Sequence, residues 1–319
     1  MENMNLLNMS MREDVDHIVW LTLDKEGSST NTLNIAILEE LLQCIRSLAV
    51  RLPKALVIQS GKTNGFIAGA DIHQFQGLET VEFSTRLIML GQQVFKELAA
   101  LPFVTVAWIS GFCLGGGLEL VLACRYRIAE DHLKTKLGLP EVMLGIHPGW
   151  GGTVRLPRLI GTLSAMELIL TGRSVSAKKA FSSGMVDACV PKRHALTAVL
   201  YYANLKNPVT KPVLHRLKKW LKKTVDIPFV RPLVGKFLYK TLNKKINIAH
   251  YPAPYAAVDN WVEQGIEKEE ALQVEAHSII QLTTSETARN LVRVFHLLRN
   301  ADAIVCCSFY ISRAFCMRK

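Results

Sequence analysis

Apolar residues gather in three short runs of the N-terminal half, and each run predicts a β-strand. The runs are Ile18 to Leu23, which predicts a strand of alternating type, Ala55 to Gln59, a short apolar strand, and Val104 to Ile109, a buried strand. Between them, apolar positions recur with the 3.6-residue period of an amphipathic helix over Asn31 to Ala49 and over Glu82 to Leu101. Strands that alternate with helices predict right-handed β-α-β crossovers and a largely parallel sheet, so the fold class is α/β.

From Ser164 onward the pattern becomes helical. Ser164 and Ser176 are typical helix N-caps, because a short hydroxyl side chain accepts from a free backbone N–H of the first turn. Gly172 and Gly184 are typical helix stops, because glycine adopts the left-handed conformation that ends many helices. We therefore expect successive short helices in this region.

Length and composition favour a folded protein with a large core. The chain has 319 residues, 49% of them hydrophobic, which is enough for one large domain or two modest ones. No apolar run approaches the length of a membrane-spanning helix, and residues 1–12 lack the pattern of a secretory signal. The seven cysteines show no paired spacing, and several of them, in apolar surroundings, are interpreted as buried thiols in a reducing compartment. These features predict a cytoplasmic protein.

The net charge of +11 arises mainly between residues 206 and 245, where Asp226 is the only acid. Apolar side chains on one helical face accompany the positive charges: Leu214, Leu217, Trp220 and Leu221. Three interpretations stay open, namely a solvated helix face, an anionic membrane surface and an acidic protein partner. Nucleic acid is disfavoured, because no binding motif accompanies the charge.

Four glycine-containing segments carry the candidate chemistry. In chain order they are Phe66-Ile-Ala-Gly-Ala-Asp-Ile72, Gly115-Gly-Gly-Leu-Glu119, Gly138-Leu-Pro-Glu141 and Pro148-Gly-Trp-Gly-Gly-Thr153. Glycine permits a close approach to bare backbone, and two of the segments add a glutamate. Backbone N–H donors and two carboxyl groups are the parts needed to polarise a carbonyl and to move protons beside it.

The order of these segments resembles the crotonase (enoyl-CoA hydratase/isomerase) family, from about Val15 to about Pro191. The residues of these segments are most similar to the hydratase half of the multifunctional fatty-acid oxidation α subunits. In those proteins a 3-hydroxyacyl-CoA dehydrogenase domain follows the hydratase domain. The resemblance implies a spiral of ββα units, as in ClpP, with trimeric assembly and a helical C-terminal region. The expected division is an extension at 1–14, a hydratase domain at 15–191, a helical linker region at 192–300 and an atypical tail at 301–319.

The sequence of the tail at 301–319 does not resemble that of the α subunits. The preceding segment from Thr284 to Phe295 does resemble the segment just before their dehydrogenase domain. No Gly-x-Gly-x-x-Gly follows a predicted strand, so the sequence predicts no NAD site. We interpret the chain as a truncated or frame-shifted product that keeps the hydratase half, with a natural short isoform as the alternative.

The resemblance assigns four catalytic positions. The N–H groups of Ala70 and Gly116 are expected to bind the thioester oxygen, Glu119 to hold and activate water, and Glu141 to deliver a proton. Apolar neighbours of both glutamates are expected to raise their pKa values toward neutrality. The substrate-binding positions are Ala68, Gly69, Asp71, Ile72, Gly115, Pro148, Gly149 and Trp150.

Other residues of this region receive lesser roles. Asp71 is expected to cap a helix that begins at Ile72, and His147 to shape the acyl pocket with Trp150 rather than act as a base. Lys25 or Lys62 is a candidate for the phosphates of coenzyme A, which enters as part of the substrate. No metal-ligand spacing occurs among the histidines and cysteines.

The sequence therefore predicts an enoyl-CoA hydratase of fatty-acid β-oxidation, with acyl-CoA thioesters as substrates. A Δ3-Δ2-enoyl-CoA isomerase is one alternative, although the resemblance implies that isomerases keep only the second glutamate. A largely non-catalytic subunit that binds a thiolase β subunit is the other. A homo-oligomer is also expected, whereas the chain-length preference stays open.

Overall fold

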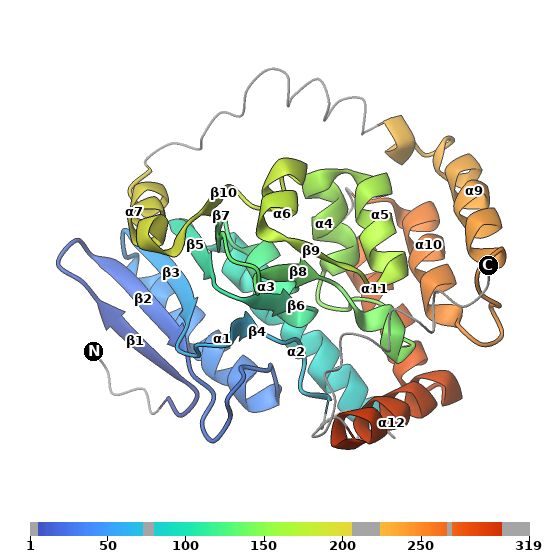
Figure 1. The fold of residues 1–319 in the computed structure, drawn as a ribbon, viewed down its shortest axis with the longest axis horizontal. Coiled ribbons are helices and arrows are strands. Elements are labelled where there is room, and N and C mark those ends of the chain that lie inside the picture. Colours follow the sequence, from blue (N-terminus) through green and yellow to red (C-terminus); the bar gives the residue numbers. More distant parts are fainter. Residues whose placement is uncertain (1–5, 73–79, 206–223, 267–269, 302–319) are drawn as a thin grey trace.

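The computed structural model describes residues 6–72, 80–205, 224–266 and 270–301 (Figure 1). Its larger sheet has the strand order β1-β2-β3-β5-β7-β10, and only β1 runs antiparallel to its neighbour. The strands are β1 (Met9–Glu13), β2 (Ile18–Leu23), β3 (Ala55–Ser60), β5 (Val104–Ile109), β7 (Tyr126–Glu130) and β10 (Ala188–Val190). The predicted parallel sheet is confirmed.

A smaller sheet has the order β4-β6-β8-β9. Its strands are β4 (Gly65–Ile67), β6 (Phe112–Leu114), β8 (Lys136–Gly138) and β9 (Ser174–Ser176). The chain repeatedly lays one strand in the larger sheet, the next in the smaller sheet, and then forms a helix: β3, β4 and α2, then β5, β6 and α3. This repetition is the expected series of ββα units, and it brings the ends of β4, β6 and β8 to one edge.

The central strands β2, β3 and β5 are buried on both faces, which explains why Ala55–Ser60 and Val104–Ile109 form apolar runs. The alternating type expected for Ile18–Leu23 is wrong for the same reason. On one face, Ile18 and Trp20 pack in a cluster with Val199 of α7 (Lys192–Ala203). On the other face, Val19 and Leu21 join the main core with α1 (Ile35–Arg51) and α2 (Val81–Ala100). Alternate residues of one strand thus serve two cores.

Short helices connect these layers to the site: α3 (Gly116–Ala123), η2 (Glu141–Leu144), α4 (Gly152–Ile160), α5 (Thr162–Thr171), α6 (Ala177–Ser183) and η3 (Thr224–Asp226). The C-terminal part is helical, as predicted, with α9 (Arg231–Asn243), α10 (Pro252–Gln264), α11 (Glu270–Thr283) and α12 (Glu286–Ala301). These helices share the main core, since Tyr255, Trp261 and Ile279 belong to it. In Figure 1, α11 lies behind α4 and α5, and it contacts α2 and α10.

Most predicted helix ends are confirmed, and two are wrong. Ser176 caps α6 through its side chain, while Gly172 and Gly184 end α5 and α6 in the left-handed conformation. Ser164 is not an N-cap, because α5 already begins at Thr162 after Gly161. The helix expected from Asn31 begins at Ile35, because residues 31–33 pair with residues 68–71 as extended chain.

Three of the cysteines, Cys44, Cys113 and Cys124, are buried free thiols, as expected. Burial raises the pKa of Cys44 to about 11 and that of Cys124 to about 12. Several predictions lie outside the described residues, including the basic segment from 206 to 223 with Leu214, Leu217, Trp220 and Leu221, and the tail from 302 to 319. In the described ranges, no helix has both the length and the apolar character needed to cross a bilayer.

Candidate functional site

Two backbone segments meet where β4 and β6 end. The chain after β4 is held against residues 31–33, since Ala68 N donates to Asn31 O at 2.9 Å and Asp71 N to Leu33 O at 2.8 Å. The start of α3 lies next to it, because a Cβ on Gly69 would come within 3.9 Å of Gly116 N. Gly69 has a φ of +115°, a value that side chains rarely permit, so this close approach requires glycine.

The N–H groups of Ala70 and Gly116 are available as donors at this meeting point. The backbone hydrogen bonds of the two segments use the N–H groups of Ala68, Asp71 and Gly115, and no acceptor among the described residues pairs with those of Ala70 and Gly116. Gly116 also opens α3, where the first N–H groups have no partner inside the helix. Such donors are suited to an oxygen that develops negative charge.

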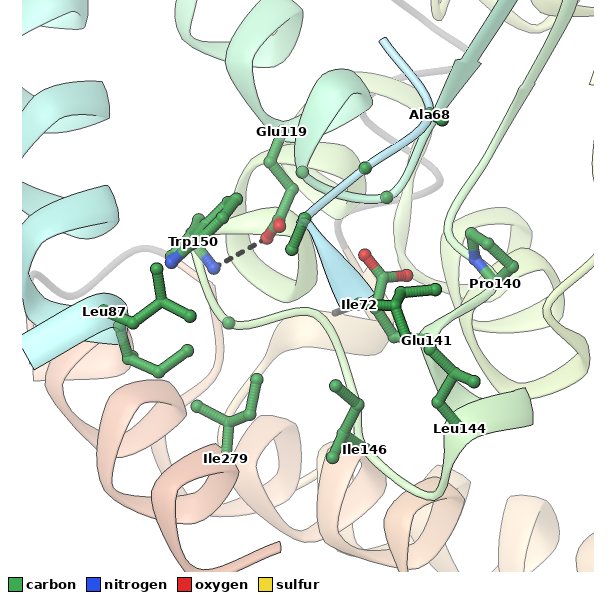
Figure 2. Close-up of a pocket in the computed structure, with 16 residues that line it drawn as sticks. Ala68, Ile72, Leu87, Glu119, Pro140, Glu141, Leu144, Ile146, Trp150 and Ile279 are labelled. Carbon is green, nitrogen blue, oxygen red and sulfur yellow. Dashed lines mark hydrogen bonds between the residues drawn. The ribbon is translucent and has the colours of Figure 1, made fainter. Parts of the chain in front are cut away.

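Glu119, in the first turn of α3, extends its carboxyl group into the same space. It is 2% exposed, and its Oε1 accepts from Trp150 N at 2.8 Å (Figure 2). The same oxygen also accepts from Gly152 N at 2.7 Å. Burial raises the pKa of Glu119 well above its ordinary value, and negative charge on Glu141 and Glu275 acts in the same direction. The two backbone donors oppose this shift. Burial and the negative neighbours thus favour the protonated form of Glu119, and the two donors favour the ionised form.

Glu141 enters the cavity from η2, on the other side of Gly115. A Cβ on Gly115 would lie 2.9 Å from Glu141 Oε1, and within the described chain Glu141 Oε2 has no hydrogen-bond partner. Burial raises the pKa of Glu141 to about 8. The carboxyl group is therefore mainly protonated at neutral pH, which is the state of a proton donor.

A cavity of about 80 Å³ lies between the two glutamates. A water molecule needs roughly 10–15 Å³ of such space, so the cavity has room for water and for part of an organic ligand. Figure 2 shows both carboxyl groups pointing into it. Of the predicted residues, it is lined by Ala68, Gly69, Ala70, Ile72, Gly115, Gly116, Glu119, Glu141, Gly149 and Trp150. Its apolar wall comes from Leu87, Ile88, Leu144, Ile146 and Ile279.

Some predicted residues lie outside this lining. Pro148 is not part of it, and neither is Asp71, whose Oδ2 accepts from Lys25 Nζ at 2.6 Å. His147 is also absent from the lining, and its ring bonds to Pro148 O at 2.7 Å and to Ser278 Oγ at 2.8 Å. Burial lowers the pKa of His147 to about 4, which leaves the ring neutral and suits a structural role.

The two lysines proposed for coenzyme A are both engaged within the fold. Lys25 pairs with Asp71, and Lys62 Nζ lies 2.5 Å from Asp24 Oδ1. The helix that Asp71 was expected to cap falls mostly in residues 73–79, outside the described chain. Both the capping role and the phosphate role stay predictions.

Glu275 is a buried carboxylate that the sequence did not reveal. It lies on α11 and is fully buried, and its oxygens accept from the N–H groups of Gly151 and Thr153 at 2.6 and 3.0 Å. Burial raises the pKa of Glu275 to about 7, against the effect of nearby Arg155. In the described ranges, no group of three His, Cys, Asp or Glu side chains is arranged to hold a metal ion.

Comparison with known proteins places these features in one family. A family model described as enoyl-CoA hydratase/isomerase matches residues 15–235. The chain is 40% identical over 304 residues to a fatty acid oxidation complex subunit alpha of Vibrio cholerae, covering 92% of this chain and 42% of that protein. A subunit of the same name from Shewanella loihica is 39% identical over 282 residues, with 87% and 39% covered. The chain thus spans well under half the length of these curated relatives.

Solved structures agree with this match. An enoyl-CoA hydratase from Bacillus anthracis is 26% identical, with a TM-score of 0.58 over 91% of this chain and 96% of that chain. An enoyl-CoA hydratase from Bacillus halodurans has a TM-score of 0.63 over 90% of this chain and 99% of that chain. At 21% identity, the second structure supports the fold alone.

Proposed function

The chain belongs to the enoyl-CoA hydratase/isomerase family, and from this premise we propose that it adds water to trans-2-enoyl-CoA thioesters to give 3-hydroxyacyl-CoA. The observation that carries the proposal is the convergence of two carboxyl groups, Glu119 and Glu141, on one cavity beside two backbone N–H groups that have no acceptor among the described residues. Each part has a separate task in a hydration.

In the proposed reaction, the thioester oxygen accepts hydrogen bonds from the N–H groups of Ala70 and Gly116. Glu119 takes a proton from a water molecule, and the oxygen of that water forms a bond to C3 of the enoyl group. The electron pair of the C2–C3 double bond moves toward the thioester, whose oxygen carries the negative charge that the two donors stabilise. Glu141 then gives its proton to C2, so that the thioester has gained one water molecule, and transfer of a proton from Glu119 to Glu141 restores both carboxyl groups.

The surroundings of the two carboxyl groups differ in a way that bears on these roles. Burial raises the pKa of Glu119, whereas the two backbone donors on its Oε1 act against that shift and stabilise the ionised form that a base requires. Glu141 has a pKa of about 8 because of burial, and its Oε2 has no hydrogen-bond partner in the part of the chain that the structure describes. Hydration by purified protein, followed on crotonyl-CoA and on a long-chain enoyl-CoA, tests the proposal. Absence of turnover on both thioesters would contradict it.

An isomerase that moves a 3-enoyl double bond to C2 is the second candidate. That reaction needs only one proton shuttle, so the presence of both carboxyl groups in the cavity favours the hydratase. An assay with a 3-enoyl-CoA substrate measures the isomerase activity directly.

We also propose that the chain performs no NAD chemistry. An assay for NADH production from 3-hydroxyacyl-CoA tests this proposal.

A binding surface for a partner is proposed on the side of α9. Phe229, Leu233 and Phe237 are 79%, 67% and 66% exposed, and the last two lie one helical turn apart. Lys236 and Lys240 are exposed on the same helix. Apolar side chains flanked by positive charge suit an anionic membrane surface, or an acidic thiolase subunit as the alternative. A catalytically inactive interaction subunit is disfavoured by the paired glutamates.

A further inference from the structure

The turn from Trp150 to Thr153 presents its successive N–H groups alternately to two buried carboxylates. Those of Trp150 and Gly152 donate to Glu119, as described above, whereas those of Gly151 and Thr153 donate to Glu275. The turn is the N-terminal end of α4, whose first N–H groups have no acceptor inside the helix. Glu119 and Glu275 therefore share the capping of one helix.

Among the described residues, every polar partner of Glu275 is a donor. In addition to the two backbone N–H groups, Thr153 Oγ1 donates to Oε2, and Gln92 Nε2 lies 3.3 Å from Oε1. An ionised carboxylate accepts only, so this arrangement fits the charged form of Glu275. The side chain is fully buried, and such a complete set of donors is what a buried carboxylate requires.

The position of Glu275 is determined by rigid neighbours. Gln92 Nε2 also donates to Gly149 O at 3.0 Å and to Leu272 O at 2.9 Å, which ties α2 to the turn and to α11. One turn beyond Glu275, Ile279 fills the space beside Gly149, where a Cβ would lie 2.4 Å from Ile279 Cδ1. A shift of α11 would therefore move the turn with it.

The charged groups that face Glu275 come from three other elements. They are Glu119 of α3, Glu141 of η2 and Arg155 of α4, whose Nη1 donates to Trp150 O at 2.7 Å. From α2 the neighbour is the neutral Gln92, and His147, which bonds to Ser278 on α11, is kept neutral by burial. The net effect of Glu275 on the two other glutamates is repulsion between like charges.

We propose that Glu275 is a positioning residue of the active site. It fixes the turn from Trp150 to Thr153, and this turn fixes the carboxyl group of Glu119. The negative charge of Glu275 also raises the pKa values of Glu119 and Glu141, and so helps Glu141 to retain its proton. The proposal rests on the proposed hydratase function. It places a functional residue on a helix that begins after residue 235, where the match to the family model ends.

The activity test compares three single variants. Glu275→Gln keeps the shape but removes the charge, and it leaves one N–H of the turn facing an amide NH₂. We expect kcat to fall by a factor on the order of 10², the loss typical of a displaced catalytic group. The pH–rate profile should move to lower pH, because Glu119 and Glu141 lose a negative neighbour. Glu275→Asp should lower kcat without that displacement, and Glu270→Gln, on the exposed side of α11, should resemble the wild type.

Hydrogen–deuterium exchange of the segment 149–155 provides a readout that needs no activity. The amides of Gly151 and Thr153 should exchange faster in Glu275→Gln than in Glu270→Gln, because they lose a carboxylate acceptor. If the wild type hydrates no thioester, the proposed function fails while this measurement still reports on the turn.

Other outcomes would overturn the proposal. One is a folded Glu275→Gln variant with the wild-type kcat, pH profile and exchange. Another is an equal loss of kcat in the Gln and Asp variants with no displacement of either profile, which would indicate general loosening. If circular dichroism showed both variants to be unfolded, Glu275 would serve the fold rather than the site.

Discussion

The six-membered ring of Trp150 occupies the space that a side chain on Gly116 would need: a Cβ there would lie 2.3 Å from Trp150 Cζ3. The indole is held in place by Phe95, which packs edge-on with ring centroids 5.7 Å apart. It also leaves no room for a side chain on Gly91, where a Cβ would lie 2.3 Å from Nε1. Glycine at 116 therefore has two functions. It exposes its backbone N–H, and its lack of a side chain lets the indole of Trp150 pack against it as part of the cavity lining.

Gly116→Ala should destabilise the protein by about 1–3 kcal/mol, the usual cost of overpacking a core. The contact with Trp150 accounts for the loss, because Gly116 itself has no positive φ. Urea unfolding of the two single variants and of the double variant with Trp150→Ala forms a double-mutant cycle. The penalty for alanine at 116 should largely disappear when the indole is absent. An equal penalty in both backgrounds would mean that another contact is responsible.

Glu119→Gln and Glu141→Gln should each lower hydratase kcat by a factor on the order of 10²–10⁴, as expected for lost acid–base groups. Both changes preserve the size of the side chain, so the fold should be retained. Glu167→Gln, at an exposed position of α5, is the matched control and should keep full activity. Near-normal turnover of crotonyl-CoA by either active-site variant would exclude that glutamate from the chemistry.

The stability of the protein should depend on the ionisation of Glu141. Its pKa of about 8 in the folded chain exceeds the ordinary value of 4.5, so between these values the folded state binds more protons than the unfolded state. Stability therefore falls as the pH rises through this window, by up to about 1.4 kcal/mol per pH unit. Glutamine at this position removes that loss. Denaturant unfolding at pH 5, 6.5 and 8 should show Glu141→Gln gaining on the wild type as the pH rises, and a constant difference would contradict the shift.

Vesicles that contain anionic lipid should bind the protein at low salt and release it at high salt. Each basic residue near such a surface contributes roughly 1 kcal/mol, and salt screens that attraction. The variant Lys236→Glu/Lys240→Glu should sediment less with vesicles, and Leu233→Ser/Phe237→Ser should also bind weakly, because it lacks apolar groups to insert. A control with Lys178→Glu changes an exposed lysine on α6. Equal sedimentation of all forms would leave α9 as a solvated helix.

The sequence was sufficient where local pattern and structure coincide. Ile18–Leu23 and Val104–Ile109 are strands with the predicted bounds, and the second is buried as its apolar run indicates, although the first is not of the expected alternating type. Gly172 and Gly184 end helices as expected, since the left-handed conformation is a local property. The candidate residues Ala68, Gly69, Ala70 and Ile72 and those at 115, 116, 119 and 141 do meet at one cavity, whereas Asp71 lies outside it. The resemblance of the motifs made that convergence predictable.

The failures have tertiary causes. Asn31 reads as the start of a helix, yet its side chain donates to Leu23 O and Phe66 O, and this holds the chain extended until Asn34 caps α1. Glu275 could not be identified, because a single glutamate in an amphipathic helix resembles any surface acid. Only the packing of α11 against the turn, 122 residues from Thr153 in the chain, reveals its role.

The separation in sequence between the turn and its second carboxylate also bears on how the protein is made. Glu275 leaves the ribosome 124 residues after Gly151, which corresponds to roughly 6–25 s of synthesis at ~5–20 residues per second. Strands β1 to β8 precede Gly151 in the chain and β9 and β10 follow within 40 residues, while the N-terminal end of α4 has only Glu119 as an anionic partner during that interval. A nascent chain can thus acquire its sheets well before it acquires a finished reaction centre, and the last step is the arrival of α11.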